Sequence, residues 1–594
     1  MQTQTKKCQN CKAAFAIEPR DFEFYASMDV PPPTFCPPCR LQRRLAWRNE
    51  RALYQRPCAL CGKTVVALQH PESKLTTYCN SCWWSDGWNA LEYGRDYDFS
   101  RPFFEQFRDL MHQVPEQSLF VMYATLVNSE YNNMNHYLKN CYLLFNSDYA
   151  EDCMYGTEVE HSKECVDVTM VDECELTYQS VNCFRCYQTY FSVDCLNCTT
   201  VWFSKNCSSC SDCFGCVNLK NKQYYIFNKP FTKEEYHKKL KEFNVGSYVA
   251  FQKAQQQARE YWLKFPFKYM HGTINENVSG DYIHHSKNVH DSFIVVEAHN
   301  CRYCMWLIVK NNKNCYDYTQ FGEDAENMYE SAVCGKGTNT VIGGYRVLGC
   351  HSIRYSMHCY DTNDLFGCIG VRKQKYCILN KQYTKEEYNA LVPKIIQHMK
   401  DMPFRDEHGR VHTYGDYFPI ALSPYAYNES TAIQFFPLTK EEALAAGYSW
   451  KDDGGQNKII TLPTSDLPDA IADATDGLEK EIIGCSHGGS CNHQCTRAFK
   501  ITAQELSFYK KNQLPLPRLC PNCRHYERVQ LKNGLALWQR KCNCSGNMSV
   551  RGTYKNVATH AHGSAPCKNE FQTTFRPEQK EIVYCEACYQ KEVE

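Results

Sequence analysis

Residues 140–165 read NCYLLFNSDYAEDCMYGTEVEHSKEC, and three times in this stretch an Asn, Asp or Glu stands directly before a cysteine. The pattern continues to residue 213, with spacings of 12, 12, 9, 9, 12, 12 and 6 between successive pairs. The eight pairs are Asn140-Cys141, Asp152-Cys153, Glu164-Cys165, Glu173-Cys174, Asn182-Cys183, Asp194-Cys195, Asn206-Cys207 and Asp212-Cys213. Short units rich in Tyr, Val, Thr and Cys predict a β-solenoid, in which stacked coils align like residues in ladders.

A weaker rhythm follows in the second half of the chain, at Asn288, Asn300, Asn314, Asn327 and Asn339, with Cys301, Cys304 and Cys315. Asn and Asp suit the turns of a solenoid because their side chains bond to neighbouring backbone. A unit of 12 residues fits either one small coil or half of a larger coil.

The 38 cysteines are unusual for a chain of 594 residues. Disulfide frameworks belong to short secreted chains, whereas this chain starts MQTQTKKCQNC, without the apolar segment of a secretory signal. No run approaches the ~18 apolar residues of a spanning helix. We therefore expect a cytoplasmic protein whose central cysteines are reduced thiols packed as small apolar groups. A metal ion or cluster is the alternative at Cys183, Cys186, Cys195, Cys198, Cys207 and Cys210.

Two segments of the middle region repeat each other at a distance of 152 residues. PheGlyCys at 214–216 and ThrLysGluGluTyr at 232–236 recur at 366–368 and 384–388. ThrLysGluGlu has the pattern of a capping box, which opens a helix. The duplication predicts two solenoid halves, each closed by a short helix.

A longer repeat joins the two ends of the chain. Shifted by 484 positions, residues 495–542 align with residues 11–58 without a gap, and nineteen of the 48 positions are identical. The shift places Arg40 on Arg524 and Arg44 on Arg528, and it also superimposes four cysteines. Each end therefore carries a related pair of cysteine modules.

The spacing of the terminal cysteines predicts four zinc modules. Two Cys-x2-Cys turns brought together supply the four thiolates of a tetrahedral zinc ion, and a closed all-thiolate site is structural rather than catalytic. We expect about four zinc ions, one per module. The predicted ligands are Cys8, Cys11, Cys36 and Cys39 in module 1; Cys58, Cys61, Cys79 and Cys82 in module 2; Cys491, Cys495, Cys520 and Cys523 in module 3; Cys542, Cys544, Cys585 and Cys588 in module 4.

The C-terminal modules depart from the regular spacing. Module 3 begins with Cys-x3-Cys and module 4 with Cys-x-Cys followed by a long insertion. Replacement ligands therefore stay open: Cys485, His487 or His493 in module 3, and Cys567, His560 or His562 in module 4.

In module 1 the alternating Phe15 and Ile17 predict a hairpin, and Pro37 with the arginine-rich run after it predicts that the second cysteine pair opens a helix. This order, together with CysProProCysArg at 36–40 and CysProAsnCysArg at 520–524, resembles the zinc-ribbon and treble-clef modules of uncharacterised bacterial cysteine-rich proteins. The resemblance covers roughly the first 90 and the last 105 residues. It implies zinc, and often contact with RNA, DNA or protein, but no reaction.

The formal net charge is zero, with 66 basic and 66 acidic residues, but the charges are segregated. Residues 1–58 carry +5 and residues 491–541 carry +8, whereas residues 128–219 carry −9. A helical projection gathers the arginines after Cys39 into one stripe. The candidate phosphate-binding residues are Arg40, Arg43, Arg44, Arg48, Arg51, Arg524, Arg528 and Lys532.

These observations favour a non-enzymatic, nucleic-acid-binding protein, with RNA or a ribonucleoprotein preferred to DNA, and with no membrane partner. The alternative is a structural or protein-interaction scaffold in which a solenoid presents a Tyr-rich acidic face. In that case the arginines dock on the acidic middle of the same chain. An enzyme is less favoured, since G-x4-GK[ST], H-E-x-x-H and G-x-S-x-G are all missing from the sequence.

The resulting fold class is multidomain and mainly β, with tandem cysteine modules at both ends of a duplicated solenoid. The expected order is modules 1 and 2 at 1–57 and 58–100, a helical connector at 101–127, solenoid halves at 128–240 and 284–400 around a helical connector at 241–283, a capping segment at 401–451, an acidic linker at 452–484, and modules 3 and 4 at 485–541 and 542–594. The linker has the composition of a tether, where we expect proteases to cut first.

Overall fold

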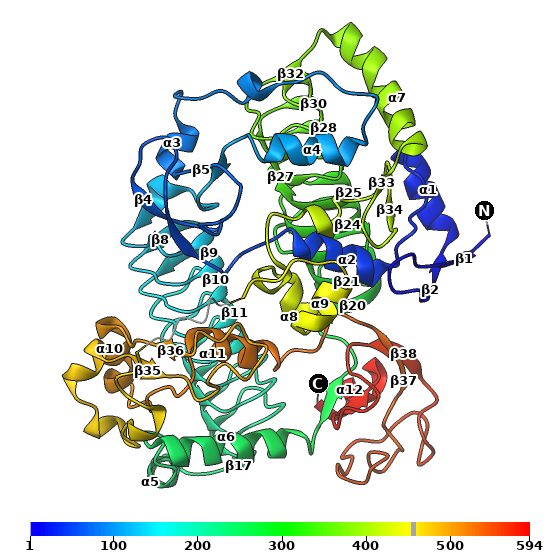
Figure 1. The fold of residues 1–594 in the computed structure, drawn as a ribbon. Helices are drawn as coiled ribbons and strands as arrows, with labels where there is room; N and C mark the ends of the chain where they lie inside the picture. Colours follow the sequence, from blue (N-terminus) through cyan, green and yellow to red (C-terminus); the bar gives the residue numbers. More distant parts are fainter. Residues whose placement is uncertain (1, 453–458, 594) are drawn as a thin grey trace.

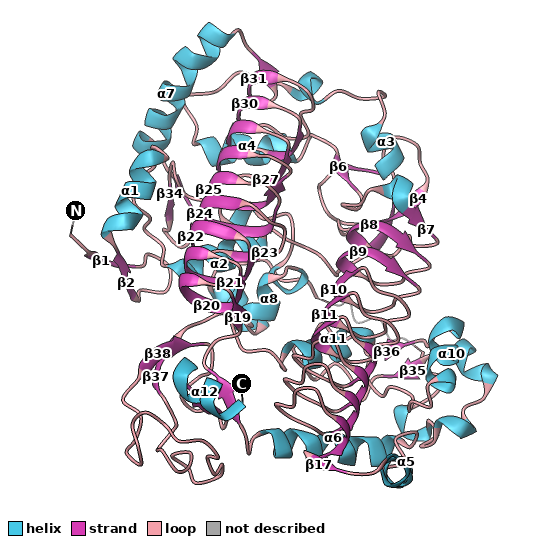
Figure 2. Cartoon of the chain, turned by 180° about the vertical axis from the view of Figure 1, so that it is seen from behind, coloured by secondary structure: helices cyan, strands magenta, loops and turns pink. Residues whose placement is uncertain are grey.

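The computed structural model describes residues 2–452 and 459–593. Its centre is a β-solenoid of about 21 turns in two stacks, which confirms the predicted mainly β fold. The first stack runs from β7 (Leu126–Val127) to β16 (Gln223–Ile226), and the second from β19 (Gly272–Thr273) to β31 (Lys375–Ile378). Seen from behind, the two stacks stand side by side (Figure 2).

One coil of the first stack contains 12 residues. β10 (Thr157–Glu160), β11 (Thr169–Asp172) and β12 (Val181–Phe184) pair in parallel, with Thr157 beside Thr169 and Thr169 beside Val181. The same offset relates β13 (Tyr187–Tyr190), β14 (Thr199–Trp202), β15 (Ser211–Phe214) and β16. The repeated unit of the sequence is therefore a complete small coil.

Each coil has four sides of three residues. Along the first stack every third residue has a positive φ, as at Asn140 (54°), Leu143 (53°) and Asn146 (51°). The residue after each of these turns inward and is buried, as are Cys141, Leu144 and Ser147. Asn and Asp recur before cysteines because they tolerate this left-handed conformation best among non-glycine residues. A spacing of 9 is thus 12 minus one side: the cysteine has moved to the neighbouring row.

The interior of the first stack is made of small side chains. All 38 cysteines, every one of which lies in the described part of the chain, are free thiols. The twelve between Cys141 and Cys216 are buried. Their sulfurs donate to backbone carbonyls, as from Cys153 to Glu151 (3.2 Å), and Ser192 Oγ accepts from the backbone N–H of Ser204 one coil on (3.2 Å). These bonds fit the expectation of reduced thiols packed in a core.

The second stack has longer strands and irregular coils. They are β20 (Glu276–His284), β21 (Lys287–Val296), β24 (Asn312–Gly322) and β25 (Glu326–Gly335). Arg302 pairs with Tyr316 and Tyr316 with Tyr329, which are offsets of 14 and 13 residues. These insertions explain why the sequence rhythm is weaker here.

A helix follows each stack. α5 (Lys233–Glu242) begins at Thr232 and α7 (Lys385–Asp401) begins at Thr384, both with the predicted capping box. α6 (Tyr248–Trp262) then leads towards the second stack (Figure 2), and its Phe251 packs on Phe191. In the described part of the chain, no helix combines the length and the apolar composition needed to cross a bilayer.

The cysteine modules dock on the solenoid in a crossed arrangement. Module 1 contains β1 (Gln4–Lys7), β2 (Ala14–Ile17), α1 (Pro19–Ser27) and α2 (Pro37–Ala46), and its α2 lies against β24 and β25 of the second stack. Module 3 contains β35 (Ile483–Gly484), β36 (Ala498–Phe499), α10 (Ala503–Lys511) and α11 (Pro521–Val529), and its α11 lies against β11 of the first stack (Figure 1).

Modules 2 and 4 are smaller. Module 2 consists of β3 (Tyr54–Pro57), β4 (Thr64–Ala67), β5 (Thr77–Tyr78) and α3 (Asn80–Trp84). Module 4 consists of β37 (Trp538–Lys541), β38 (Glu570–Thr573), β39 (Ile582–Tyr584) and α12 (Glu586–Val593), and its β39 pairs in parallel with β18 (Pro266–Lys268).

The segment expected to be a tether packs against its neighbours where it is described. Residues 453–458 of that segment lie outside the described residues. Leu467, Ile471 and Leu478 are buried in the hydrophobic cluster that also holds α6 and α10. Asp469 accepts the backbone N–H of Val249 at the start of α6 (3.0 Å). The apolar residues spaced between its acidic ones anchor this segment.

Candidate metal centres and arginine contacts

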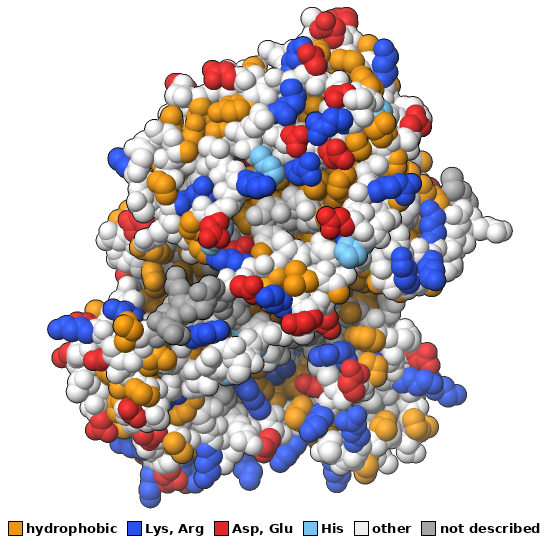
Figure 3. Space-filling view, viewed as in Figure 1, with side chains coloured by type: hydrophobic (Ala, Val, Ile, Leu, Met, Phe, Trp, Pro, Cys, Tyr) orange, Lys and Arg blue, Asp and Glu red, His pale blue; other side chains and the backbone are white. Residues whose placement is uncertain are grey.

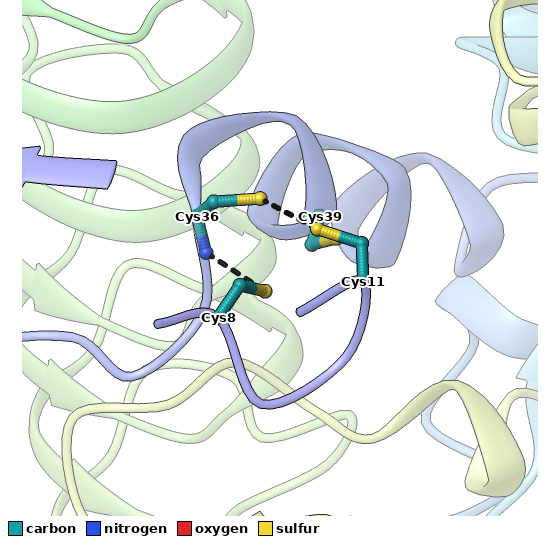
Figure 4. Close-up of side chains that lie close together, drawn as sticks. All are labelled: Cys8, Cys11, Cys36 and Cys39. Carbon is teal, nitrogen blue, oxygen red and sulfur yellow. Dashed lines mark hydrogen bonds between the residues drawn. The ribbon is translucent and has the colours of Figure 1, made fainter. Parts of the chain in front are cut away.

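Module 1 gathers four cysteines from a hairpin turn and a helix start. Cys8 and Cys11 lie in the turn between β1 and β2, Cys36 caps α2, and Cys39 lies in its first turn (Figure 4). Their sulfurs all lie within 4.8 Å of one another. A tetrahedron with zinc–sulfur bonds of ~2.3 Å has edges of ~3.8 Å, so this donor set fits one such ion.

Hydrogen bonds in module 1 favour thiolates. The backbone N–H of Cys36 donates to Cys8 Sγ (3.3 Å), and the Asn10 amide donates to Cys39 Sγ (3.4 Å). The hydrogen bond with Cys36, followed by that from Asn10, lowers the pKa of Cys39 to about 5. Module 2 repeats this geometry: Cys58, Cys61, Cys79 and Cys82 come together, and the backbone N–H of Cys79 donates to Cys58 Sγ (3.2 Å).

In module 3 the four-cysteine group contains Cys485 together with the predicted Cys495, Cys520 and Cys523. The backbone N–H of Cys520 donates to Cys485 Sγ (3.3 Å), as Cys36 does to Cys8. Cys491, which the spacing predicted for this position, belongs to a second group with His487, His493 and Cys523.

A strand register explains the replacement in module 3. Lys7 pairs with Ala14 just before Cys8, and Gly484 pairs with Ala498 just before Cys485. Ala498 is the residue that the 484-residue shift places on Ala14. The first ligand therefore follows the strand, and the added residues form a longer loop after it. The apolar Ile482 and Ile483 before Cys485 were the sequence signal for that strand.

In module 4 the group consists of Cys542, Cys567, Cys585 and Cys588, with Cys567 where the spacing predicted Cys544. The backbone N–H of Cys585 again donates to the first cysteine, Cys542 (3.2 Å). Cys544 is buried, and its sulfur accepts a hydrogen bond from Asn556 (3.1 Å). Of the alternative ligands, His560 bonds to Glu592 (2.9 Å), and His562 Nε2 lies 3.4 Å from Cys588 Sγ.

The arginines of α2 are buried in ion pairs rather than exposed. Arg40 Nε lies 2.9 Å from Asp317, and Arg44 Nη1 lies 3.1 Å from Asp317 and 3.0 Å from Glu330. Arg43 also pairs with Glu330. These arginine side chains are at most 2% exposed, so in this structure they do not form a phosphate-binding surface.

Arg48 and Arg51 are also enclosed. Arg48 bonds to Glu50 and Gln320. Arg51 donates to Thr157 Oγ1 (3.1 Å) and stacks over the Phe145 ring, and burial lowers its pKa to about 10.

Module 3 makes the equivalent contacts with the other stack. Arg524 pairs with Asp167 (2.7 Å) and Glu505 (3.1 Å), and Arg528 pairs with Asp167 (2.9 Å). Lys532 lies over the Tyr282 ring, 5.5 Å from its centroid. Asp167 thus does for module 3 what Asp317 does for module 1.

A row of aromatic rings is exposed on the first stack, one coil apart. The ring centroids of Tyr137 and Tyr149 are 4.9 Å apart, as are those of Tyr149 and His161, and the planes are tilted by 9° and 5°. Tyr137 and Tyr149 are 49% and 48% exposed. We call these three rings the aromatic ladder.

A row of carboxylates runs beside the aromatic ladder. Asp148, Glu160 and Asp172 occupy the same register position of β9 (Phe145–Glu151), β10 and β11. Burial, and then the charges of Asp148 and Asp172, raise the pKa of Glu160 well above its ordinary value. We call this row the acidic ladder.

The fold and these centres define a class: a two-stack β-solenoid held between cysteine modules that can each bind a metal ion. The chain matches no protein-family model, no curated protein and no solved structure.

Proposed function

We propose that this protein is a zinc-stabilised, non-enzymatic scaffold that binds a basic segment of a partner protein along the first solenoid stack. The observation that carries the proposal is how the charges are used. The arginines of both terminal modules are occupied by internal carboxylates, whereas the aromatic and acidic ladders face outwards. On the face shown in Figure 3, the remaining basic side chains are interspersed with acidic ones.

Stacked rings beside carboxylates suit guanidinium and ammonium groups. A cation over an aromatic face gains about 0.5–1 kcal/mol at an exposed site, and neighbouring carboxylates add Coulomb attraction. The same carboxylates repel phosphates, which disfavours nucleic acid on this surface. Successive coils present the two rows at regular intervals, which fits an extended segment.

The zinc in this proposal is structural. Four closed thiolate groups on small modules hold α2 and α11 in place, since such modules have too few apolar residues to fold without a metal. Treble-clef geometry and zinc as the resident ion belong to the proposal and rest on the donor sets and on the helix that begins at Cys36 and at Cys520.

Fluorescence anisotropy with labelled ligands tests the proposal. An arginine-rich peptide should bind more tightly than an acidic peptide of the same length and than an RNA oligonucleotide. The variant Tyr137→Ala/Tyr149→Ala should weaken peptide binding several-fold. Tyr187→Ala is the matched control, because Tyr187 is 40% exposed but lies outside the aromatic ladder. Tighter binding of RNA, or a peptide affinity unchanged by the double substitution, would contradict the proposal.

A further inference from the structure

The first loop of module 3 is longer than its counterpart in module 1. Two residues separate Cys8 from Cys11, whereas nine separate Cys485 from Cys495. The added residues bring His487, Cys491 and His493 to the module. One ligand atom from each of these three residues and Cys523 Sγ lie within 4.8 Å of one another. Module 3 thus contains two four-ligand groups that share Cys523.

The histidines are oriented as metal ligands are. The Nδ1 atoms of His487 and His493 are buried, and neither has a hydrogen-bond partner. Their other nitrogens do have neighbours: His487 Nε2 lies 3.9 Å from Glu527 Oε1, and His493 Nε2 lies 3.4 Å from the Gln530 amide. In metal sites the nitrogen that does not bind the ion typically faces a carboxylate or another polar group, which fixes the ring. Both neighbours belong to or follow α11.

The sulfur distances suit a shared thiolate. Cys523 Sγ lies 3.9 Å from Cys485 Sγ in the first group and 3.7 Å from Cys491 Sγ in the second. Both distances match the ~3.8 Å edge of a tetrahedron around zinc. In module 1 the equivalent sulfur, on Cys39, instead accepts a hydrogen bond from Asn10.

We propose that module 3 binds a second divalent ion of the zinc class through His487, Cys491, His493 and Cys523, with the Cys523 thiolate bridging the two ions. The donor set of two imidazoles and two thiolates selects a borderline ion such as Zn²⁺ over Mg²⁺ or Ca²⁺. The half-buried His487, Cys491 and His493 leave this second ion nearer to solvent than the first. The second ion holds the added loop on the start of α11.

Metal analysis of the full chain tests the second site. The variant His487→Ala/His493→Ala should contain one ion fewer per chain than the wild type. The matched control His284→Ala/His285→Ala changes two histidines of the second stack and should keep the full number. Equal metal content in the wild type and the His487/His493 variant would overturn the proposal.

Cadmium-113 spectroscopy of the intact protein is the second measurement, which decides the question if the variant loses both ions of module 3. With Cd²⁺ as the probe, the bridging thiolate should produce two mutually coupled signals, and Cys491→Ser should remove the coupling. A wild-type spectrum whose signals are all uncoupled would overturn the proposal.

Discussion

Glu158 is a carboxyl group enclosed between solenoid and modules, where it is 8% exposed. Burial raises its pKa from 4.5 to about 7, against the opposing attraction of Lys532 and Arg48 and with repulsion from Glu50. The unfolded chain therefore loses this proton at a lower pH than the folded chain does. Stability is lost as the pH rises from 4.5 to about 7, a cost that reaches about 3 kcal/mol.

Glu158→Gln should therefore stabilise the protein most at high pH. Between pH 5.5 and pH 8, the advantage of the variant in unfolding free energy should grow by about 2 kcal/mol. Guanidinium unfolding of both proteins measures it, and taking the difference cancels the pH dependence of metal binding. Glu130→Gln, at an exposed position, is the control. A constant advantage across this pH range would contradict the assignment.

At the level of single residues, the sequence could predict the cysteine modules but not every ligand. Twelve of the four-group cysteines in modules 1, 2 and 3 and two in module 4 do not all follow one spacing rule, because insertions shift the first ligand to Cys485 and bring in Cys567. The strand that ends at Gly484 decides the first case, and such short strands leave little trace in a sequence.

At the level of elements, the coil is set by its three-residue side. A left-handed residue follows two ordinary ones, and the next side chain must fit a narrow interior. The spacing of 12 predicted stacked units. The size of the coil could not be predicted, because a ladder of like residues looks the same in a sequence whether a unit is a whole coil or half of one.

A larger side chain in this interior should destabilise the stack. Cys195 is 1% exposed, and its neighbours in sequence and across the coils are also small. Cys195→Leu should cost about 1–3 kcal/mol through overpacking, whereas Cys195→Ser should cost less because Ser192 and Ser204 already bond well in this core. Chemical unfolding measures both. A neutral Leu substitution would show that the interior is not narrow, and metal lost from the Ser variant would show that these cysteines bind an ion.

At the level of the whole molecule, the two ends of the chain are crossed over the two stacks. Arg44 bonds to Asp317 and Thr319, and Arg528 bonds to Asp167 and Thr169. The duplicated modules therefore use duplicated docking sites, each on the more distant stack in sequence. The basic stripe was visible in the sequence, but its carboxylate partners lie more than 270 residues away, so its burial could not be read from the pattern.

This arrangement makes the arginines part of the core. Removing one member of a buried ion pair typically costs about 3–5 kcal/mol, because its partner keeps an uncompensated charge. Reversing the charge adds repulsion to that cost. The intramolecular alternative considered for the basic stripe thus has a definite mechanical consequence: without the arginines, module 1 should leave the second stack.

Small-angle scattering on Arg40→Glu/Arg44→Glu, together with RNA filter binding, tests this central claim most directly. The variant should show a larger radius of gyration, an unchanged metal content and an unchanged affinity for RNA, because the arginines contact Asp317 and Glu330 rather than phosphates. Lys7→Glu/Lys63→Glu makes the same change of charge at exposed positions of modules 1 and 2 and should leave the particle compact. An unchanged radius with a lost affinity for RNA would contradict the account and return the arginines to a nucleic-acid surface.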